Sequence, residues 1–467
     1  MACIYWHISN KKIYFLKLIN KISPISDINY LALIDPLKNL GASHILGLKV
    51  EFKRFPTTFI KRKIFPRNTM KFQKKTLNNG ITVVHEQRDL PVVSFSISNK
   101  FGGAYESSEI KGIAHVIEHL LFTGTKTRSH EDISREIEKR GGILNAFTSN
   151  DLTSYWFKLP AEHLFSGMDI LIDMLKNASF DKEKFEKEKK VILEEIKMYH
   201  DMPQRHIYDK IIANLYEEPF GIGIIGTKET VSSLTRDFVK DYFEKHYSPE
   251  NFIVTLVGQA DFEKVCNYLE KEFERQNKVL PPVELKKINK NSVEERQGLD
   301  QAHYIMAMHA PLADDKKRYS LEVLDAYLAN GMSSRLFLEI REKRGLAYTV
   351  RSAYEVEKNY AYYSIYVGTT KEAIPEVEKI IIAEFKDVEK MTDNDLKEAK
   401  ERLIGLRKVS SEESINVMNE LIFSELSTQA EDYYRHEEEI NKISLEDVKS
   451  MAKEIISKYS TASIIPK

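Results

Sequence analysis

The chain has 467 residues and a formal net charge of −1, with 42% hydrophobic and 30% charged residues. This length exceeds one ordinary hydrophobic core, and the composition is not that of a disordered chain, so we expect a globular protein of two or more domains. Its two cysteines are too few for a disulfide scaffold or a cysteine-built zinc site. No apolar run approaches the roughly 18 residues that span a membrane, so we predict no membrane span.

The N-terminal segment differs in charge from the rest of the chain. Residues 1–69 hold 12 Lys and Arg against 3 Asp and Glu, whereas the later residues hold 57 against 67. A basic, acid-poor N-terminus is typical of organellar targeting segments, but Pro24 and Pro36 interrupt any amphipathic helix. We therefore interpret residues 1–69 as an extension outside the fold. We expect a cytoplasmic protein, with a mitochondrial or other organellar location as the alternative.

Strands and helices alternate in the predicted first domain, residues 70–275. Strands are expected where β-branched and aromatic residues cluster, and helices where apolar residues recur with helical spacing or glycines mark a C-terminus. In chain order we predict strands at 81–85 and 92–98, helices at 112–122 and 130–140, strands at 143–149 and 152–159, helices at 161–177, 181–200 and 204–215, and a strand at 252–257.

A polar, lysine-rich segment with two prolines, residues 276–298, is predicted to be a linker. Beyond it the order of elements recurs, with a strand at 302–309, helices at 316–330 and 332–343, strands at 346–356 and 360–368, and long helices at 372–389 and 393–425. The recurrence predicts an α+β protein of two homologous domains, residues 70–275 and 299–467. Each is expected to hold an antiparallel-rich sheet with helices packed on it.

The helix predicted at 112–122 contains the sequence His115-Val-Ile-Glu118-His119. Histidines four residues apart project from one helix face and are a natural pair of zinc ligands. With Glu118 they form the inverted H-x-x-E-H arrangement of inverzincins. The apolar neighbours indicate a buried helix, where these polar groups would be costly without a metal. We therefore predict zinc, one Zn²⁺ per chain, because the corresponding helix of the second half lacks this motif.

A catalytic zinc needs a third protein ligand. Glu188 and Glu195 are seven residues apart on a predicted helix and share a face, close to the apolar Val191 and Ile192. Glu194 points roughly 100° away from that face. We therefore predict Glu195 as the third zinc ligand and Glu188 as a group that orients a ligand or stabilises the charge of the site.

These motifs resemble the pitrilysin family of zinc metallopeptidases, which includes insulin-degrading enzyme and the mitochondrial processing peptidases. The resemblance covers nearly all of residues 70–467, and the spacings that lead to Glu188 and Glu195 match the family as well. Residues 141–149 resemble the family's G-G-x-x-N-A-x-T-S strand, whose edge pairs with the substrate backbone. The resemblance implies this role for Asn145 and Ala146.

Two segments of the second half also resemble the family, at residues 331–336 (G-x-x-S-R-L) and 341–348 (R-x-x-x-G-L-A-Y). In the family an arginine and a tyrosine seven residues apart approach the substrate near its scissile bond. The resemblance implies this role for Arg341 and Tyr348. It also implies a clamshell dimer, in which this half of one subunit faces the zinc of an identical or homologous partner.

The resulting hypothesis is a zinc-dependent endopeptidase that hydrolyses peptides or unfolded polypeptide segments, with Glu118 as general base. The alternatives are a non-catalytic or structural subunit and an organellar presequence-processing peptidase subunit. Retention of the whole predicted zinc site favours an active enzyme. No basic stripe with interleaved aromatic residues is present in the core of the chain, so nucleic acid is not expected as a partner.

Overall fold

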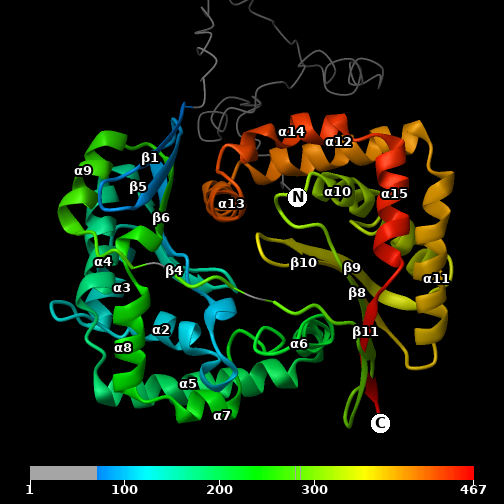
Figure 1. The fold of residues 1–467 in the computed structure, drawn as a ribbon, viewed down its shortest axis with the longest axis horizontal. Helices are drawn as coiled ribbons and strands as arrows, with labels where there is room; N and C mark the ends of the chain where they lie inside the picture. The colour runs from blue at the N-terminus through cyan, green and yellow to red at the C-terminus, as the bar shows by residue number, and fades with distance from the viewer. Residues whose placement is uncertain (1–70, 279, 284) are drawn as a thin grey trace, which may run out of the picture. The chain divides into compact units, whose positions relative to one another are not determined.

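The computed structural model describes residues 71–467 except 279 and 284. The predicted extension, residues 1–69, lies outside the described residues. Within the described part, two β-sheets carry most of the helices on their faces (Figure 1). No helix among these residues is long and apolar enough to cross a membrane.

The first sheet has six strands in the order β1-β2-β6-β3-β5-β4. Strands β2 and β6 pair in parallel, and the other neighbours are antiparallel. Strand β6 is buried along its whole length, whereas β4 lies at the edge of the sheet. The bounds are β1 (Lys71–Thr76), β2 (Thr82–Gln87), β3 (Val92–Asn99), β4 (Ile143–Thr148), β5 (Thr153–Pro160) and β6 (Phe252–Gly258).

The second sheet repeats this topology without a counterpart of β1. Its order is β7-β11-β8-β10-β9, and β7 and β11 form a parallel pair at the same place as β2 and β6. The bounds are β7 (Asn291–Arg296), β8 (Ala302–His309), β9 (Ala347–Val356), β10 (Ala361–Thr369) and β11 (Ser460–Pro466). The α+β class and the two-domain organisation predicted from the sequence are therefore confirmed.

The structure differs from the sequence prediction in two places. Strand β7 falls inside residues 276–298, the predicted linker, so the end of that segment belongs to the second sheet. The long helix predicted at 393–425 is two helices, α12 (Asp393–Ser410) and α13 (Ser414–Ser427). Asn416 Nδ2 donates to the Ser410 carbonyl oxygen (3.2 Å), and side-chain bonds to the backbone of this kind compete with the helix.

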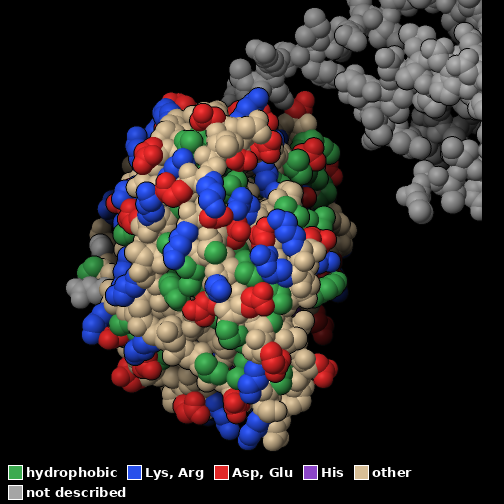
Figure 2. Space-filling model, turned by 90° about the vertical axis from the view of Figure 1, so that its right-hand side faces the viewer, with side chains coloured by type: hydrophobic (Ala, Val, Ile, Leu, Met, Phe, Trp, Pro, Cys, Tyr) green, Lys and Arg blue, Asp and Glu red, His purple; other side chains and the backbone are tan. Residues whose placement is uncertain are grey.

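The helices divide between the two sheets. The first core is built with α2 (Ile113–Leu121), α3 (His130–Glu138), α4 (Leu164–Asn177), α5 (Lys182–Asp201), α7 (Lys228–Ser233), α8 (Arg236–His246) and α9 (Phe262–Glu272). The second is built with α10 (Lys317–Leu328), the π-helix η7 (Phe337–Glu342), α11 (Ile374–Asp387), α12, α14 (Asp432–Lys442) and α15 (Leu445–Ile456). Figure 2 shows one outer face, on which acidic and basic side chains are interspersed.

Each half of the chain also supplies one helix to the sheet of the other half. Helix α6 (Pro203–Leu215) packs on β8 and β11, and its Ile207, Ile211 and Leu215 are fully buried there. Helix α13 packs on β3 and β6 and buries Met418 and Leu421. Burial of each such side chain is worth about 1.5–3 kcal/mol. This reciprocal packing fixes the two halves to each other with their inner surfaces around one cavity.

Candidate metal centre

Helix α2 presents one polar face within an otherwise apolar core. Ile113, Ile117 and Leu120 are buried on its core side. Because the helical repeat is 3.6 residues, His115 and His119 then lie together on the remaining face, with Glu118 beside them. That face packs against α5. Local periodicity alone therefore directs the predicted metal-binding side chains toward the second helix.

Helix α5 supplies the carboxylates. Asp181 caps its N-terminus, because the Asp181 side chain accepts a hydrogen bond from the Lys184 N–H (2.9 Å). Ile192 is fully buried and orients the helix. Glu188 and Glu195 face α2, whereas Glu194 points outward and pairs with Lys197 (2.5 Å).

The three predicted ligands converge on one point. Oε2 of Glu195 lies 3.5 Å from Nε2 of His119 and 3.8 Å from Nε2 of His115. One donor atom from each residue lies within 4.8 Å of the other two. Donors bound to a tetrahedral zinc at about 2.1 Å are separated by roughly 3.4 Å, so this set fits zinc with little movement. Three protein donors would leave the fourth position for water or substrate.

The two histidines differ in their outer hydrogen bonds. Oε2 of Glu188 lies 3.3 Å from Nδ1 of His119, the nitrogen that points away from Glu195. Nδ1 of His115 is buried and has no hydrogen-bond partner among the described residues. Glu195 in turn accepts a hydrogen bond from the Tyr199 hydroxyl.

The protonation states suit a metal site. Burial, together with the neighbouring His119, lowers the pKa of His115 to about 4, so its ring is neutral at pH 7. The hydrogen bond with His119 lowers the pKa of Glu195. Burial works to lower the pKa of His119, but hydrogen bonds with Glu195 and Glu188 outweigh it and raise the pKa. When His119 carries its second proton in the metal-free protein, its Nδ1–H faces Glu188 and its Nε2–H faces Glu195.

Glu118 lies beside the predicted ligands in a setting that suits a base. Burial raises its pKa, and the Thr148 hydroxyl donates to its Oε2 at 2.5 Å. A carboxylate with a raised pKa accepts a proton more readily near neutral pH. Thr148 was not singled out from the sequence, although it is the threonine of the G-G-x-x-N-A-x-T-S segment.

Strand β4 brings the predicted substrate-binding residues close to the predicted metal ligands. It pairs with β5 and, within the described part of the chain, with no other strand, so one edge is free. Asn145 is exposed, and its Oδ1 accepts a hydrogen bond from the Ala146 N–H (2.8 Å). Ala146 and Thr148 line a cavity together with His115.

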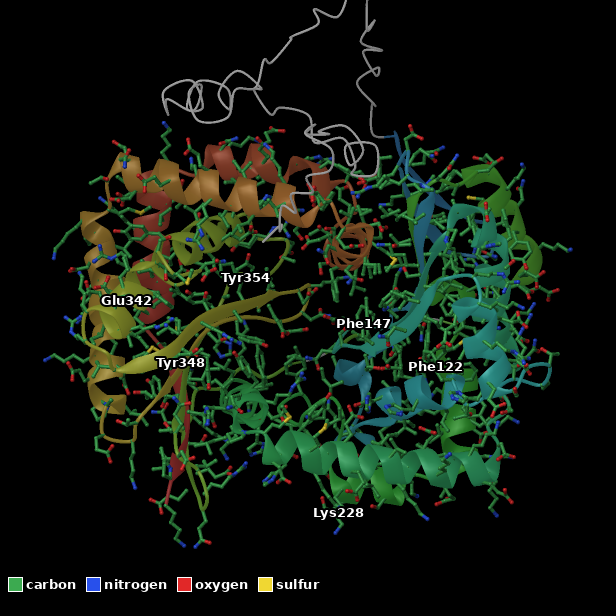
Figure 3. The ribbon with its side chains drawn as sticks, turned by 180° about the vertical axis from the view of Figure 1, so that it is seen from behind. Phe122, Phe147, Lys228, Glu342, Tyr348 and Tyr354 are labelled. Carbon is green, nitrogen blue, oxygen red and sulfur yellow. The ribbon has the colours of Figure 1, made fainter. Side chains whose placement is uncertain are left out.

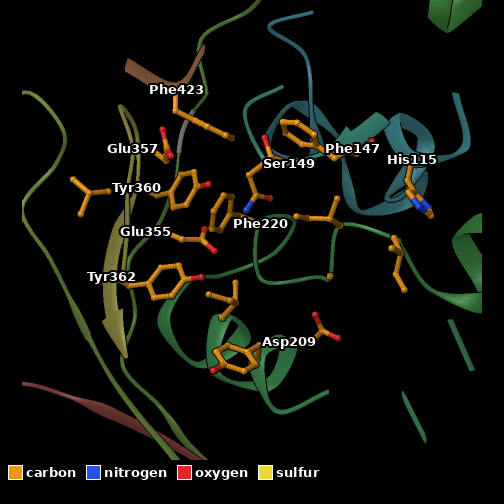
Figure 4. A pocket seen from close by; sticks show the side chains of 18 of the residues that line it. His115, Phe147, Ser149, Asp209, Phe220, Glu355, Glu357, Tyr360, Tyr362 and Phe423 are labelled. Atoms are coloured by element: carbon orange, nitrogen blue, oxygen red, sulfur yellow. The ribbon is translucent and has the colours of Figure 1, made fainter. Parts of the chain in front are cut away.

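The cavity lies between the two halves and has a volume of about 1110 Å³. Glu355, Glu357, Tyr360 and Tyr362 lie on the wall across from His115 (Figure 4). Burial raises the pKa of Glu357 to about 8. The acidic residues of the lining are Glu118, Glu195, Asp209, Glu322, Glu355, Glu357 and Glu420, and the basic residues are Arg205 and Arg318.

Arg341 and Tyr348 are not brought to the predicted zinc ligands within one chain. Tyr348 is 75% exposed, and its ring lies 5.2 Å from the Arg341 guanidinium. Neither residue lines the cavity. Figure 3 shows Tyr348 in the lobe opposite to Phe122 and Phe147, which lie near α2.

A second group with metal-ligating side chains, His200, His206 and Glu294, brings its donor atoms within 4.8 Å. Here the carboxylate is already neutralised, because Glu294 pairs with Lys210 (2.9 Å) and Arg296 (2.6 Å). Burial opposes their effect, but these two cations lower the pKa of Glu294 to about 2. The arrangement is an ion-pair network that links α6 to β7.

Comparison with known proteins identifies the family. Residues 82–228 match the model described as "Insulinase (Peptidase family M16)", and residues 233–403 match "Peptidase M16 inactive domain". The uncharacterized zinc protease YmxG of Bacillus subtilis is 30% identical over 410 residues, which cover 84% of this chain and 98% of that protein. The chain belongs to peptidase family M16. The resemblance to the pitrilysin family, which is this family, is thereby confirmed.

A second relative also bears the name zinc protease, and two solved structures share the fold. An uncharacterized zinc protease of Streptomyces coelicolor, SCO5738, is 30% identical over 413 residues, covering 84% of this chain and 89% of that one. A crystal structure of a protease from Helicobacter pylori has a TM-score of 0.80 at 22% identity and covers 85% of this chain and 100% of its own. A crystal structure of a peptidase M16 inactive domain from Pseudomonas fluorescens has a TM-score of 0.77 at 18% identity and covers 85% of this chain and 98% of its own.

The second M16 domain has no H-x-x-E-H sequence in the helix that corresponds to α2. Gly124 after α2 and Gly331 after α10 both have positive φ. An arginine follows each glycine by four residues, Arg128 and Arg335, and each arginine pairs with a carboxylate of the next long helix. When the helices are aligned on these glycines, Asp325 takes the place of Glu118. Asp325 is buried and accepts a hydrogen bond from the Tyr363 hydroxyl (3.0 Å), so it serves the core.

Proposed function

We propose that this M16 protein is a zinc-dependent endopeptidase that hydrolyses peptides or unfolded polypeptide segments. The observation that carries the proposal is the convergence of His115, His119 and Glu195 beside Glu118, at the wall of a cavity between the halves. Relatives at 30% identity bear the name zinc protease, which supports the same metal and reaction class.

Each residue of the site has a definite task in peptide hydrolysis. His115, His119 and Glu195 would hold Zn²⁺, which when bound would polarise a water molecule and the scissile carbonyl. Glu118 takes a proton from the attacking water and delivers it to the leaving amine as the C–N bond breaks. The Thr148 hydroxyl holds the Glu118 carboxylate in place at 2.5 Å. Glu188 orients His119.

The free edge of β4 supports binding of an extended substrate. An unpaired strand edge offers backbone N–H and C=O groups to which a peptide can add as a further strand. Asn145 and Ala146 lie on this strand, and its end reaches Glu118 through Thr148. A segment must therefore be unfolded before it can lie along β4, so we expect folded proteins to remain intact.

The positions of Arg341 and Tyr348 support a dimer. Both belong to the second domain and are too far from the cavity of their own chain to line it. We propose that they complete the site of a partner subunit, as the family resemblance implies, in a homodimer or in a heterodimer with a homologous subunit. The bacterial relatives favour a cytoplasmic location over a mitochondrial one.

A cleavage screen tests the function. Purified protein with measured zinc content is incubated with short and long unstructured peptides and with folded proteins, and mass spectrometry locates the cuts. Internal cleavage of unstructured peptides that requires zinc is expected, and the control Glu118→Gln should retain zinc without cleavage. Stoichiometric zinc with no cleavage of any peptide would favour a structural subunit. Cleavage restricted to presequence-like peptides would favour the processing alternative.

A further inference from the structure

The start of the metal-binding helix is held by a buried carboxylate that belongs to no metal ligand. Glu106 is 2% exposed and precedes α2 in a loop. Its Oε2 accepts a hydrogen bond from the Gly112 N–H (3.0 Å) and its Oε1 from the Ala114 N–H (2.8 Å). The first N–H groups of a helix have no partners inside the helix, and Glu106 satisfies two of them here.

A buried lysine completes this arrangement. Lys111 is fully buried, and its Nζ lies 3.6 Å from Oε2 of Glu106 and donates to the Gly103 carbonyl oxygen (2.6 Å). The Lys111 carbonyl oxygen accepts a hydrogen bond from the Thr230 hydroxyl (2.7 Å). Gly112 has φ of +98°, and a Cβ there would lie 2.7 Å from the Ile225 carbonyl oxygen. The backbone that enters α2 is therefore held from several sides.

The first turn of α2 carries His115, directly after Ala114. A metal-binding histidine ordinarily donates its second ring N–H to a carboxylate, carbonyl or water, which fixes the ring. His119 has such a partner in Glu188, 3.3 Å away. His115 has none among the described residues, since its Nδ1 is buried without a hydrogen bond. The direction of its ring must then come from the backbone and from packing.

We propose that Glu106 is a positioning residue for the metal centre. Its carboxylate fixes the first turn of α2 and thereby aims His115 at the point where Glu195 and His119 meet. Glu106 thus orients His115 by holding the backbone of the helix. Glu188 orients His119 by contacting its side chain directly. The inference rests on the proposed function insofar as that assigns zinc to these ligands.

The test is Glu106→Gln, in which the amide keeps one acceptor oxygen but loses the second, so one backbone N–H of the first turn is left without a partner. Zinc affinity is measured by chelator competition well below the melting temperature, and the visible spectrum of the cobalt-substituted protein reports the geometry of the ligands. Changes beyond the metal's direct ligands typically cost 10–100-fold in affinity, so about tenfold weaker zinc binding with altered cobalt bands is expected.

Glu384→Gln is the matched control. Glu384 is also a buried carboxylate, paired with Arg335 at 2.5 Å in the second domain, far from the metal ligands in the chain. The substitution Glu384→Gln should lower the melting temperature while leaving zinc affinity and the cobalt spectrum unchanged. Should Glu106→Gln not fold, the double variant Glu106→Gln/Lys111→Met removes the buried ammonium as well and is expected to show the same loss.

The outcomes separate this inference from the proposed function. Unchanged zinc affinity and cobalt bands in the Glu106 variant would overturn the positioning role. An equal loss of zinc affinity in Glu384→Gln would show that the effect of Glu106→Gln comes from lower protein stability and not from positioning. Failure of the unchanged protein to bind zinc would instead overturn the proposed function.

Discussion

Glu188 and His119 form a pair in which Oε2 of the carboxylate faces Nδ1 of the imidazole at 3.3 Å, on the opposite side of the ring from Glu195. A carboxylate in this place fixes the tautomer that presents Nε2 to a metal and makes that nitrogen a stronger donor. We therefore expect the two glutamates of α5 to have separate tasks, although they lie on one helix face.

Removal of this carboxylate should weaken metal binding. We expect Glu188→Ala to lower zinc affinity by about 10–100-fold. Glu188→Gln should cost less, because the amide oxygen still accepts from Nδ1. Chelator competition measures both. Glu194→Ala, one residue from Glu195 and exposed, is the control and should bind zinc as the unchanged protein does. Full affinity in Glu188→Ala would contradict the orienting role.

Zinc binding should weaken as the pH falls. The metal must displace a proton from His119, whose pKa is raised by Glu195 and Glu188 above the usual value of 6.5. Competition therefore begins at a higher pH than for an ordinary histidine and approaches tenfold per pH unit below the pKa. His115, with a pKa of about 4, does not contribute to this proton competition until the solution is much more acidic. Zinc titrations between pH 8 and 5 measure this, and an affinity independent of pH over that range would refute it.

Loss of the base should separate binding from chemistry. Glu118→Gln keeps the size and the hydrogen bond from Thr148 but removes the proton acceptor. We expect stoichiometric zinc with cleavage reduced by at least 10²–10⁴-fold. Thr148→Val should show a smaller loss, because the carboxylate remains but is no longer held. Peptide cleavage rates at saturating zinc provide the measurement, and full activity in Glu118→Gln would remove this residue from the mechanism.

The local part of the site could be predicted from the sequence. The H-x-x-E-H spacing and the seven-residue step from Glu188 to Glu195 each define a helix face, and helical periodicity needs no knowledge of the rest of the fold. The strands predicted at 143–149 and 152–159 correspond to β4 and β5 within a residue or so. The arrangement of side chains within a single helix or strand could therefore be predicted from the sequence.

The remainder depends on contacts that no local pattern encodes. Strand β7 has the sequence Asn-Ser-Val-Glu-Glu-Arg and lies at a sheet edge, so its composition is that of a linker. Asp209 on α6 and Glu355 on β9 meet at one cavity only because α6 packs on the second sheet. Glu106 was missed because helix capping from a preceding loop leaves no fixed spacing in the sequence.

The proposed dimer leads to a complementation experiment. If Arg341 and Tyr348 act on the zinc of a partner, a mixed homodimer of Glu118→Gln and Tyr348→Phe subunits contains one intact site. Equal mixing with subunit exchange should then restore about a quarter of the activity, since half the dimers are mixed and one of their two sites is complete. Native mass measurements verify the dimers. No recovery in a verified mixed dimer would show that the two residues do not act across subunits.

The acidic wall of the cavity should favour basic peptides. Seven acidic side chains and two arginines line it. Glu357, with a pKa of about 8, is mostly protonated at pH 7, but the other six acidic side chains still outnumber the arginines. A low-dielectric cleft with an excess of one charge concentrates ligands of the opposite charge. We expect a lysine-rich peptide to have a higher kcat/KM than a glutamate-rich peptide of equal length, and the ratio should shrink as salt rises. Glu355→Gln, on the wall facing His115, should reduce the ratio. Glu274→Gln removes an exposed charge outside the cavity and is the matched control. An equal decrease of the kcat/KM ratio in both variants would show that the preference comes from the net charge of the protein. A ratio of one in the unchanged protein at low salt would show that there is no preference for basic peptides.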